Sequence, residues 1–450
     1  MSVIGQLADF VNGSEFTRLS QDTVEHLKMH LLDTIGAMLV GSQTPAGEAI
    51  GKVLGNLKAH GNIPAVGYSV RTSLLPSIMV GCAGARCTEV DDIHLPSCTT
   101  PGSVIIPSAL SLASAGYLSD PEDFLTAVAV GYDMLIRLGM AIDGPRILYK
   151  GVWPTLFGAA LGTAAMAAKA LRLTSQQVIS ATLAALSMST GVVGRLRGDL
   201  STRWLLLGTA AQNGVIAAFL AKEGFSGNDA LLEGNSVRIN GIRISMRKLA
   251  DRLGKKFFID ETSMKPYAIA RQAISAVEAF REIIATNRVE PDSIQEVSVW
   301  VPPSFMAIIN HPEFPRNRIE SVVSIQYQMA LAAYSPQALL DVKRNRLLKN
   351  TLLSTFIQKV NVQPSEELEL YYPSVWPARV EVKTGSQSYS QSMLYPKGDT
   401  GNRLSWDEVA SKFNRLTKPT LSNNAADEVV SLARNLDQND SLVHLLKQLS

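Results

Sequence analysis

Cysteine is scarce in this sequence, with three residues in a chain of 450. Cys82, Cys87 and Cys98 contain no C-x-x-C pair of the kind found in zinc and redox sites. The six histidines show no metal-ligand spacing either, so we expect no metal site. An odd number of cysteines, together with an N-terminus that lacks a signal-peptide pattern, predicts a reducing, cytoplasmic location.

An excess of charge of either sign is also absent. Lys and Arg number 42 against 40 Asp and Glu, and a net charge of +2 gives no strong field for nucleic acid or an anionic membrane. The longest apolar run, residues 152–168, is too short for a convincing membrane span. Because H-E-x-x-H, Walker and Rossmann patterns are missing, the sequence implies neither a metal nor a nucleotide.

The sequence does have length and apolar content. A chain of 450 residues exceeds the usual single-domain size, and 46% hydrophobic residues can bury a large core, so two domains are expected. In the first half, apolar residues recur at helical spacing between Gly, Pro or polar boundaries. The predicted helices span residues 20–41, 46–60, 74–87, 104–115, 121–140, 155–170, 175–188 and 205–223.

The pattern changes in the second half, where residues alternate with period two. Strands are predicted at 294–301, 357–362, 378–384 and 388–395, with a helix at 270–286 before the first strand and another at 321–334 after it. The end of the chain returns to helix. We therefore predict a mainly α fold, with a large all-helical domain (residues 1–263 and 404–450) and a smaller α+β lid domain (residues 264–403).

One stretch, residues 81–115, interrupts the helical pattern with an acidic cluster. Glu89, Asp91 and Asp92 follow the predicted end of a helix, where carboxylates oppose the helix dipole at a cost that a functional role would explain. The Ser- and Thr-rich loop after them leads into an apolar helix, whose N-terminus can bind an anion. We interpret this stretch as the corner of an active site; the alternative is an acidic turn with one solvated histidine.

The motifs of this stretch resemble those of a known family. Glu-Val-Asp-Asp-Ile-His, followed by Thr-Pro-Gly-Ser, is similar to the D-F-D-D-x-H and H-P-G/S segment of the MmgE/PrpD family. Further segments at 265–267, 324–327 and 396–399 extend the resemblance over nearly the whole chain. The family contains 2-methylcitrate dehydratase, cis-aconitate decarboxylase and iminodisuccinate epimerase, so the resemblance implies a cofactor-independent enzyme for a small polycarboxylate.

The resemblance also implies roles for individual residues. Asp92 and Lys265, in Lys-Pro-Tyr, match catalytic positions of the family pattern. Asp91 and Tyr327, in Ser-Ile-Gln-Tyr, are expected to bind substrate.

Three positions depart from the family pattern. Thr100 and Trp153 stand where the dehydratases and decarboxylases have histidines, and Arg203 replaces a lysine. Thr100 and Arg203 remain candidates for substrate binding. Loss of two imidazoles removes groups that titrate near neutrality, which dehydration and decarboxylation use. An epimerase instead needs two bases on opposite faces of one carbon.

Tyr149 and Lys150 lie just before Trp153, and we predict that they supply a catalytic base near the missing histidine. The alternative is a helix-flanking pair whose polar ends reach solvent. His94 is a further candidate for substrate binding, although a plain loop histidine explains it equally well.

Arginines cluster in the segment Gly-Arg-Leu-Arg-Gly at 194–198. Arg195 and Arg197 in this Gly-flanked loop suit bidentate binding of substrate carboxylates. A solvated basic turn is the alternative.

Together these features predict an epimerase that removes a proton next to a carboxylate of a small polycarboxylate such as iminodisuccinate. A hydro-lyase or decarboxylase acting on a citrate- or aconitate-like acid is the first alternative, and a non-catalytic binding paralogue is the second. We also expect a homodimer, because the apolar helices of the first half have more surface than a small lid can cover.

Overall fold

The computed structural model describes residues 2–194, 202–232, 237–385, 387–438 and 440–450. The chain is mainly α-helical, as predicted. Its internal contacts divide it into a first unit, Met1–Thr262 with Ser405–Ser450, and a second unit, Ser263–Leu404. Arg195 and Arg197 lie outside the described residues, so their predicted role stays a prediction.

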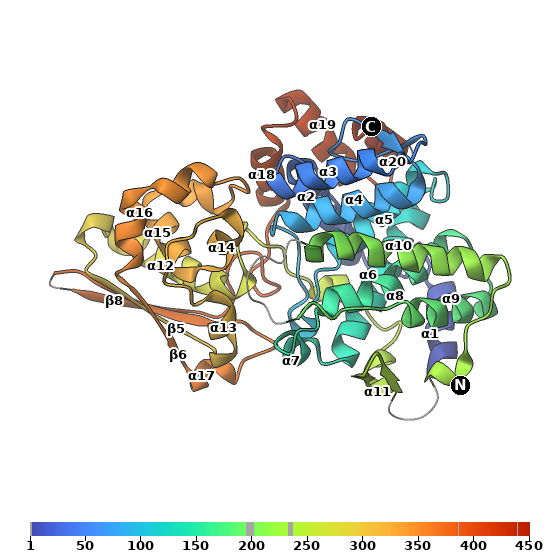
Figure 1. The fold of residues 1–450 in the computed structure, drawn as a ribbon, viewed down its shortest axis with the longest axis horizontal. Coiled ribbons are helices and arrows are strands. Elements are labelled where there is room, and N and C mark those ends of the chain that lie inside the picture. The colour runs from blue at the N-terminus through green and yellow to red at the C-terminus, as the bar shows by residue number, and fades with distance from the viewer. Residues whose placement is uncertain (1, 195–201, 233–236, 386, 439) are drawn as a thin grey trace. The chain divides into compact units, whose positions relative to one another are not determined.

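The first unit consists mainly of helices, and Figure 1 shows their order. Ser20 caps the second helix through its side chain, and Thr174 forms a capping box at the ninth, as their positions before apolar runs suggest. The helices are α1 (Val3–Gly13), α2 (Gln21–Gly41), α3 (Pro45–Asn56), α4 (Leu74–Cys87), α5 (Gly102–Ser114), α6 (Pro121–Ala141), α7 (Gly144–Leu148), α8 (Pro154–Ala170), α9 (Ser175–Ser187), α10 (Thr202–Lys222), α11 (Met246–Leu249), α18 (Trp406–Thr417), α19 (Asn423–Arg434) and α20 (Ser441–Gln448).

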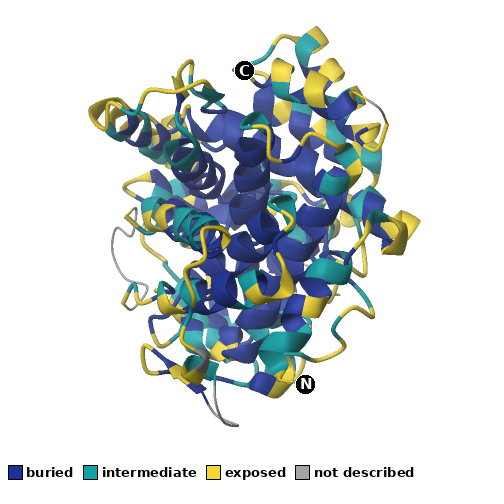
Figure 2. Cartoon of the chain, turned by 90° about the vertical axis from the view of Figure 1, so that its right-hand side faces the viewer, coloured by how far each residue is buried: buried dark blue, intermediate teal, exposed yellow. Residues whose placement is uncertain are grey.

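Small residues let the central helices approach closely. α8 packs against α6 and α10, and α4 packs against α2, α5 and α10. A Cβ atom on Gly162 of α8 would lie 2.8 Å from Cβ of Leu135 on α6, and one on Gly214 of α10 would lie 2.1 Å from the carbonyl oxygen of Ala160. Figure 2 shows the buried interior of the chain in dark blue, and α6 and α8 are buried along most of their length. The Gly-x-x-x-Gly spacing in α8 therefore serves close packing inside this unit.

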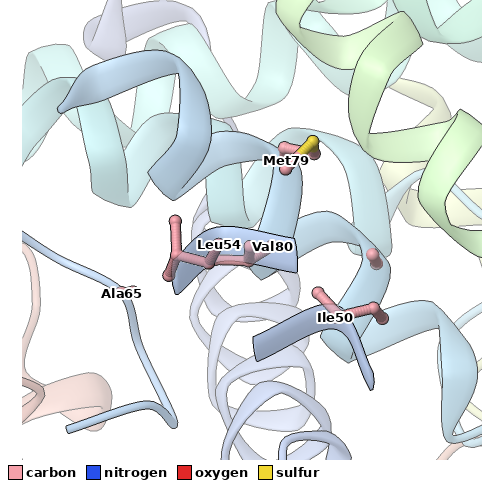
Figure 3. Packing of buried hydrophobic residues seen from close by; sticks show 6 residues of the cluster. Ile50, Leu54, Ala65, Met79 and Val80 are labelled. Atoms are coloured by element: carbon pink, nitrogen blue, oxygen red, sulfur yellow. The ribbon is translucent and has the colours of Figure 1, made fainter. Parts of the chain in front are cut away.

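A second packing layer joins α3 to α4. Ile50 and Leu54 of α3 contact Met79 and Val80 of α4, and Ala65 completes the cluster (Figure 3). Each of these side chains is buried, and the cluster holds the middle of α4, the helix that leads to the acidic cluster.

Two helices of the first unit, α6 and α10, are long and apolar enough to cross a membrane by length and composition alone. This is weak evidence, because core helices pass the same test, and 94% of the apolar window in α6 is buried inside the protein. Two short antiparallel hairpins also occur, β1 (Ile63–Pro64) with β2 (Arg71–Thr72), and β3 (Val237–Ile239) with β4 (Ile242–Ile244). Neither hairpin was predicted.

The second unit contains a four-stranded sheet in the order β6-β5-β7-β8. β5 (Glu296–Val301) pairs in parallel with β6 (Val360–Pro364) and antiparallel with β7 (Ala378–Lys383), which forms the predicted hairpin with β8 (Ser388–Met393). The strand predicted at 357–362 begins three residues later, because a helix continues to Ile357. The helices are α12 (Arg271–Asn287), α13 (Met306–Ile309), α14 (Arg318–Val323), α15 (Ile325–Tyr334), α16 (Thr351–Ile357) and α17 (Glu366–Glu369).

Candidate active site

The acidic cluster follows directly on α4, and its charges are compensated. Arg86, in the last turn of α4, lies 2.7 Å from a carboxylate oxygen of Glu89 and 3.1 Å from one of Asp91. All three side chains are buried. Burial alone would lower the pKa of Arg86, but Asp91 and Glu89 outweigh it, and the pKa is raised above its usual value. The cost expected for carboxylates at this helix end is therefore offset by ion pairing.

Asp92 is held by three donors. Its Oδ1 accepts a hydrogen bond from the backbone N–H of Gly102 at 2.8 Å, and its Oδ2 lies 2.8 Å from both the hydroxyl of Tyr132 and Nδ1 of His30. A Cβ on Gly102 would lie 2.8 Å from the Asp92 and Tyr132 oxygens, so only glycine fits here without rearrangement. The helix N-terminus that we expected to bind an anion thus binds the chain's own Asp92. A catalytic role for this buried carboxylate stays a prediction.

The indole ring of Trp153 contacts two guanidinium groups. The central carbons of Arg86 and Arg203 are each 4.9 Å from the centroid of its ring. Arg203 donates to Glu89 at 2.9 Å, yet burial lowers the pKa of Arg203 despite this partner. Within the part of the chain that the structure describes, Nε of Arg86 and Nε of Arg203 are buried without a hydrogen-bond partner. Trp153, at the substituted histidine position, therefore contacts two guanidinium groups, both of which also pair with carboxylates of the acidic cluster. We call Arg86, Arg203 and Trp153 the cationic corner.

The second substituted position lies beside the first. The backbone N–H of Thr100 donates to the hydroxyl of Thr155 at 3.0 Å, and the two hydroxyls are 3.2 Å apart. Thr155 is in the first turn of α8, two residues after Trp153. The structure thus brings together the two places where the resemblance had led us to expect imidazoles.

Tyr149 and Lys150 precede the same helix. Residues 151–153 run alongside 191–193, with backbone hydrogen bonds from Val193 to Gly151 and from Trp153 to Gly191. The side chain of Lys150 is exposed, whereas the hydroxyl of Tyr149 is buried. The role of this pair as bases stays a prediction, and for Lys150 the solvent-exposed alternative matches its placement.

His94 lies in the core rather than on an open surface. Its Nδ1 accepts from the backbone N–H of Ser97, and its ring meets that of Phe258 edge-on at 5.6 Å. His94 is completely buried, so a substrate could contact its imidazole only after the residues around it had moved. Burial, with a smaller effect from Lys256, lowers the pKa of His94 from 6.5 to about 3.

The buried imidazole makes a testable contribution to acid sensitivity. Because the pKa of His94 is lowered on folding, the unfolded chain binds this proton first, and stability is lost as pH falls from 6.5 toward 3. Between pH 7 and pH 5 this group should cost about 2 kcal/mol of unfolding free energy. In urea titrations, the unfolding free energy of His94→Gln should fall between pH 7 and pH 5 by about 2 kcal/mol less than that of the wild type. An equal fall in the two proteins would show that His94 does not titrate in this way.

Two predicted residues belong to the second unit. Lys265 is buried. Tyr327 is fully buried against Phe314, and burial raises the pKa of Tyr327 to about 12, so it stays neutral. Its hydroxyl has no hydrogen-bond partner among the described residues. The roles of both residues stay predictions.

Sequence reasoning missed several members of the first-unit site. Arg86, His30 and Tyr132 were not singled out, and Lys412, which donates to the carbonyl of Val90 at 3.0 Å, was not assigned to the site. A usable signal existed, because each of them lies on the buried side of an apolar or amphipathic helix. A polar side chain at such a place needs a buried partner. No group of three or more potential metal-binding side chains occurs among the residues that the structure covers.

Comparison with known proteins places the chain among enzymes. It is 24% identical to a cis-aconitate decarboxylase of Aspergillus terreus over 96% of this chain and 92% of that protein. It is 22% identical to the cis-aconitate decarboxylase of Homo sapiens, over 97% and 92% of the two chains. A cis-aconitate decarboxylase-like protein of Aspergillus oryzae is 27% identical over 50% of this chain and 48% of its own length.

Two family models match the chain in succession. Residues 5–241 match the MmgE/PrpD N-terminal domain, and residues 267–438 match the MmgE/PrpD C-terminal domain. The first match alone spans more than half of the sequence. The chain belongs to the MmgE/PrpD family.

Proposed function

We propose that this protein is a lyase acting on a small polycarboxylate of the aconitate or citrate class, and that decarboxylation of cis-aconitate is the first reaction to test. Similarity to proteins named cis-aconitate decarboxylase over almost the whole chain supports this proposal. It also revises the order of our expectations, because an epimerase was the first prediction and a lyase its alternative.

The observation that carries the proposal is the cationic corner formed by Arg86, Arg203 and Trp153. A polycarboxylate needs cationic groups to hold its charges, and a guanidinium matches a carboxylate in geometry. The side chain of Arg203 is 16% exposed and that of Arg86 is 7% exposed, so Arg203 is the more accessible of the two. The Nε–H group of each guanidinium has no hydrogen-bond acceptor among the residues that the structure describes.

The chemistry of decarboxylation suits such a corner. The bond between carbon and the leaving carboxylate breaks, neutral CO₂ departs, and the electron pair stays on the carbon until a proton replaces CO₂. An indole face next to the leaving carboxylate favours the neutral product over the anion. Guanidinium groups fixed beside it stabilise the negative charge that spreads onto the remaining carboxylates. The corner thus contributes binding and electrostatic stabilisation.

The proton must come from a group other than the two family histidines. His94 is buried with a low pKa, and Thr100 and Trp153 are not acids near neutrality. Lys265 or Tyr149 is our candidate for the donor, as the resemblance and the chain order suggested.

Epimerisation remains the second candidate, and one specific observation favours it. Neither Thr100 nor Trp153 can deliver a proton in the way of an imidazole, and an epimerase expels no group that needs one. It requires two bases instead, one on each face of the reacting carbon.

One experiment separates these reactions. The purified protein is incubated in D₂O with cis-aconitate, citrate-like hydroxy acids and iminodisuccinate, and the products are followed by NMR and CO₂ release. Our proposal predicts CO₂ or an unsaturated acid as the product. Deuterium incorporation without loss of a group would identify an epimerase, and no turnover of any acid would favour a binding protein.

A further inference from the structure

The turn that carries the acidic cluster has an unusual backbone. Glu89 has a φ of 62°, in the left-handed region that costs a non-glycine residue about 1–2 kcal/mol. Its side chain pairs with Arg86 and Arg203. Asp91 also pairs with Arg86, and Asp92 accepts a hydrogen bond from the backbone of Gly102. The direction of every carboxylate in the cluster therefore depends on this turn keeping its shape.

Lys412 reaches this turn from the C-terminal end of the chain. α18 buries one face, and Lys412 lies on it beside Val409 and Phe413, where an apolar residue would be expected. Its ammonium group lies 2.6 Å from a carboxylate oxygen of Asp33 and donates to the carbonyl oxygen of Val90 at 3.0 Å. A lysine that is 5% exposed is costly unless it is paired and hydrogen-bonded in this way.

α2 holds the other side of the same turn. Asp33, the partner of Lys412, lies one helical turn after His30, whose Nδ1 is 2.8 Å from Asp92. Lys412 therefore holds the carbonyl of Val90 while His30 holds the carboxylate of Asp92, on either side of Asp91.

We propose that Lys412 is a positioning residue, which fixes the turn at residues 88–92 so that Glu89 and Asp92 meet their partners. The segment after the second unit, residues 405–450, is then part of the construction of the site. The structural part of this inference is independent of the proposed function, and only its effect on turnover depends on that function.

The chain offers a matched control for this test. Lys28 is also buried and also joins α2 to the C-terminal segment, with its ammonium group 2.7 Å from Asp437. It makes no recorded contact with residues 88–92. Lys28→Met and Lys412→Met thus remove similar ties between the same parts of the chain, and only the second removes the bond to Val90.

A double variant separates the bond to Val90 from the ion pair. Lys412→Met alone leaves the carboxylate of Asp33 buried without its partner, so the whole unit can lose stability. Asp33→Asn combined with Lys412→Met removes both charges and leaves the carbonyl of Val90 without its donor. Lys412→Arg retains a donor and is expected to preserve the turn.

The measurement is hydrogen exchange of the full-length protein at the amides of residues 88–94. We expect exchange to be about 10-fold faster in the double variant than in the wild type, since a buried carbonyl loses its hydrogen bond, and within about 2-fold of the wild type in Lys28→Met. Equal exchange in the double variant and the wild type would overturn the proposal. Failure of the double variant to fold, with Lys28→Met folded, would also overturn it by assigning Lys412 to global packing.

Turnover provides a second readout. With cis-aconitate as the probe, the double variant should lose about 10-fold or more in kcat/KM, and Lys412→Arg should recover most of this loss. If the wild type does not turn over cis-aconitate, the proposed reaction fails, but the exchange result still decides the role of Lys412. Normal turnover in a double variant whose turn exchanges faster would contradict a positioning role.

Discussion

Arg86→Met is expected to lower the unfolding free energy by about 3–5 kcal/mol, the largest effect of any single substitution discussed for this protein. The guanidinium of Arg86 neutralises Glu89 and Asp91, and both carboxylates are buried. Removing it takes one buried ion pair from Asp91 and one from Glu89, which still pairs with Arg203. Urea or thermal unfolding at pH 7 measures the loss.

An exposed ion pair provides the control for this substitution. Arg172 pairs with Asp123 at 2.9 Å, but its side chain is 83% exposed, so Arg172→Met should cost less than about 1 kcal/mol. A loss under about 1 kcal/mol in Arg86→Met would show that the acidic cluster does not depend on this ion pairing.

Arg203→Met is expected to have the largest effect on catalysis, lowering kcat/KM for cis-aconitate by about 100-fold. Its stability cost should be smaller than that of Arg86→Met, because Glu89 keeps its ion pair with Arg86. Arg203→Lys, which introduces the residue that the family pattern has here, retains the charge and should lose less activity.

Steady-state kinetics with the same substrate tests this expectation. Arg146→Met is the control, since Arg146 is an exposed arginine near α8 with a partner at 3.7 Å, and it should leave kinetics unchanged. Because charge pairing to a carboxylate acts in both the substrate and the transition state, Arg203→Met should raise KM as well as lower kcat. Unchanged kinetics in Arg203→Met would remove the cationic corner from the mechanism.

Local patterns in the sequence predicted most of the fold. The helix at 74–87 was placed at its exact bounds, and the helix at 121–140 within one residue, because Pro and Asp mark the start of α6 and apolar residues continue through it. The predicted helix at 321–334 is instead two helices. Ser324 ends α14 and caps α15, accepting a hydrogen bond from the backbone of Tyr327, and a polar residue within an apolar run gave no local sign of this break.

The site was harder to predict because its contacts join residues far apart in the chain. Asp92 meets His30 from 62 positions away, and Lys412 meets Val90 across 322 positions. No periodicity or motif carries such information. The family resemblance located the acidic cluster and the substituted histidines, but the stacking of Arg86 and Arg203 on Trp153 required the structure.

The acidic cluster also shows how a local rule can mislead. Carboxylates after a helix end oppose its dipole, and this suggested a functional strain. In the folded protein Arg86, in the same helix, pairs with Glu89 and Asp91, so most of that cost is offset locally. Arg86 lies three residues before Glu89, and this spacing is the signal that could have indicated the pairing.

The measurement that tests the central claim most directly is release of labelled CO₂ from carboxyl-labelled cis-aconitate by the purified full-length protein, compared with Arg203→Met under the same conditions. We expect labelled CO₂ together with an unsaturated dicarboxylate in equal amounts, and a rate reduced about 100-fold in the variant. Labelled carbon that remains in the acid while deuterium from D₂O enters it, or equal rates in the two proteins, would contradict it.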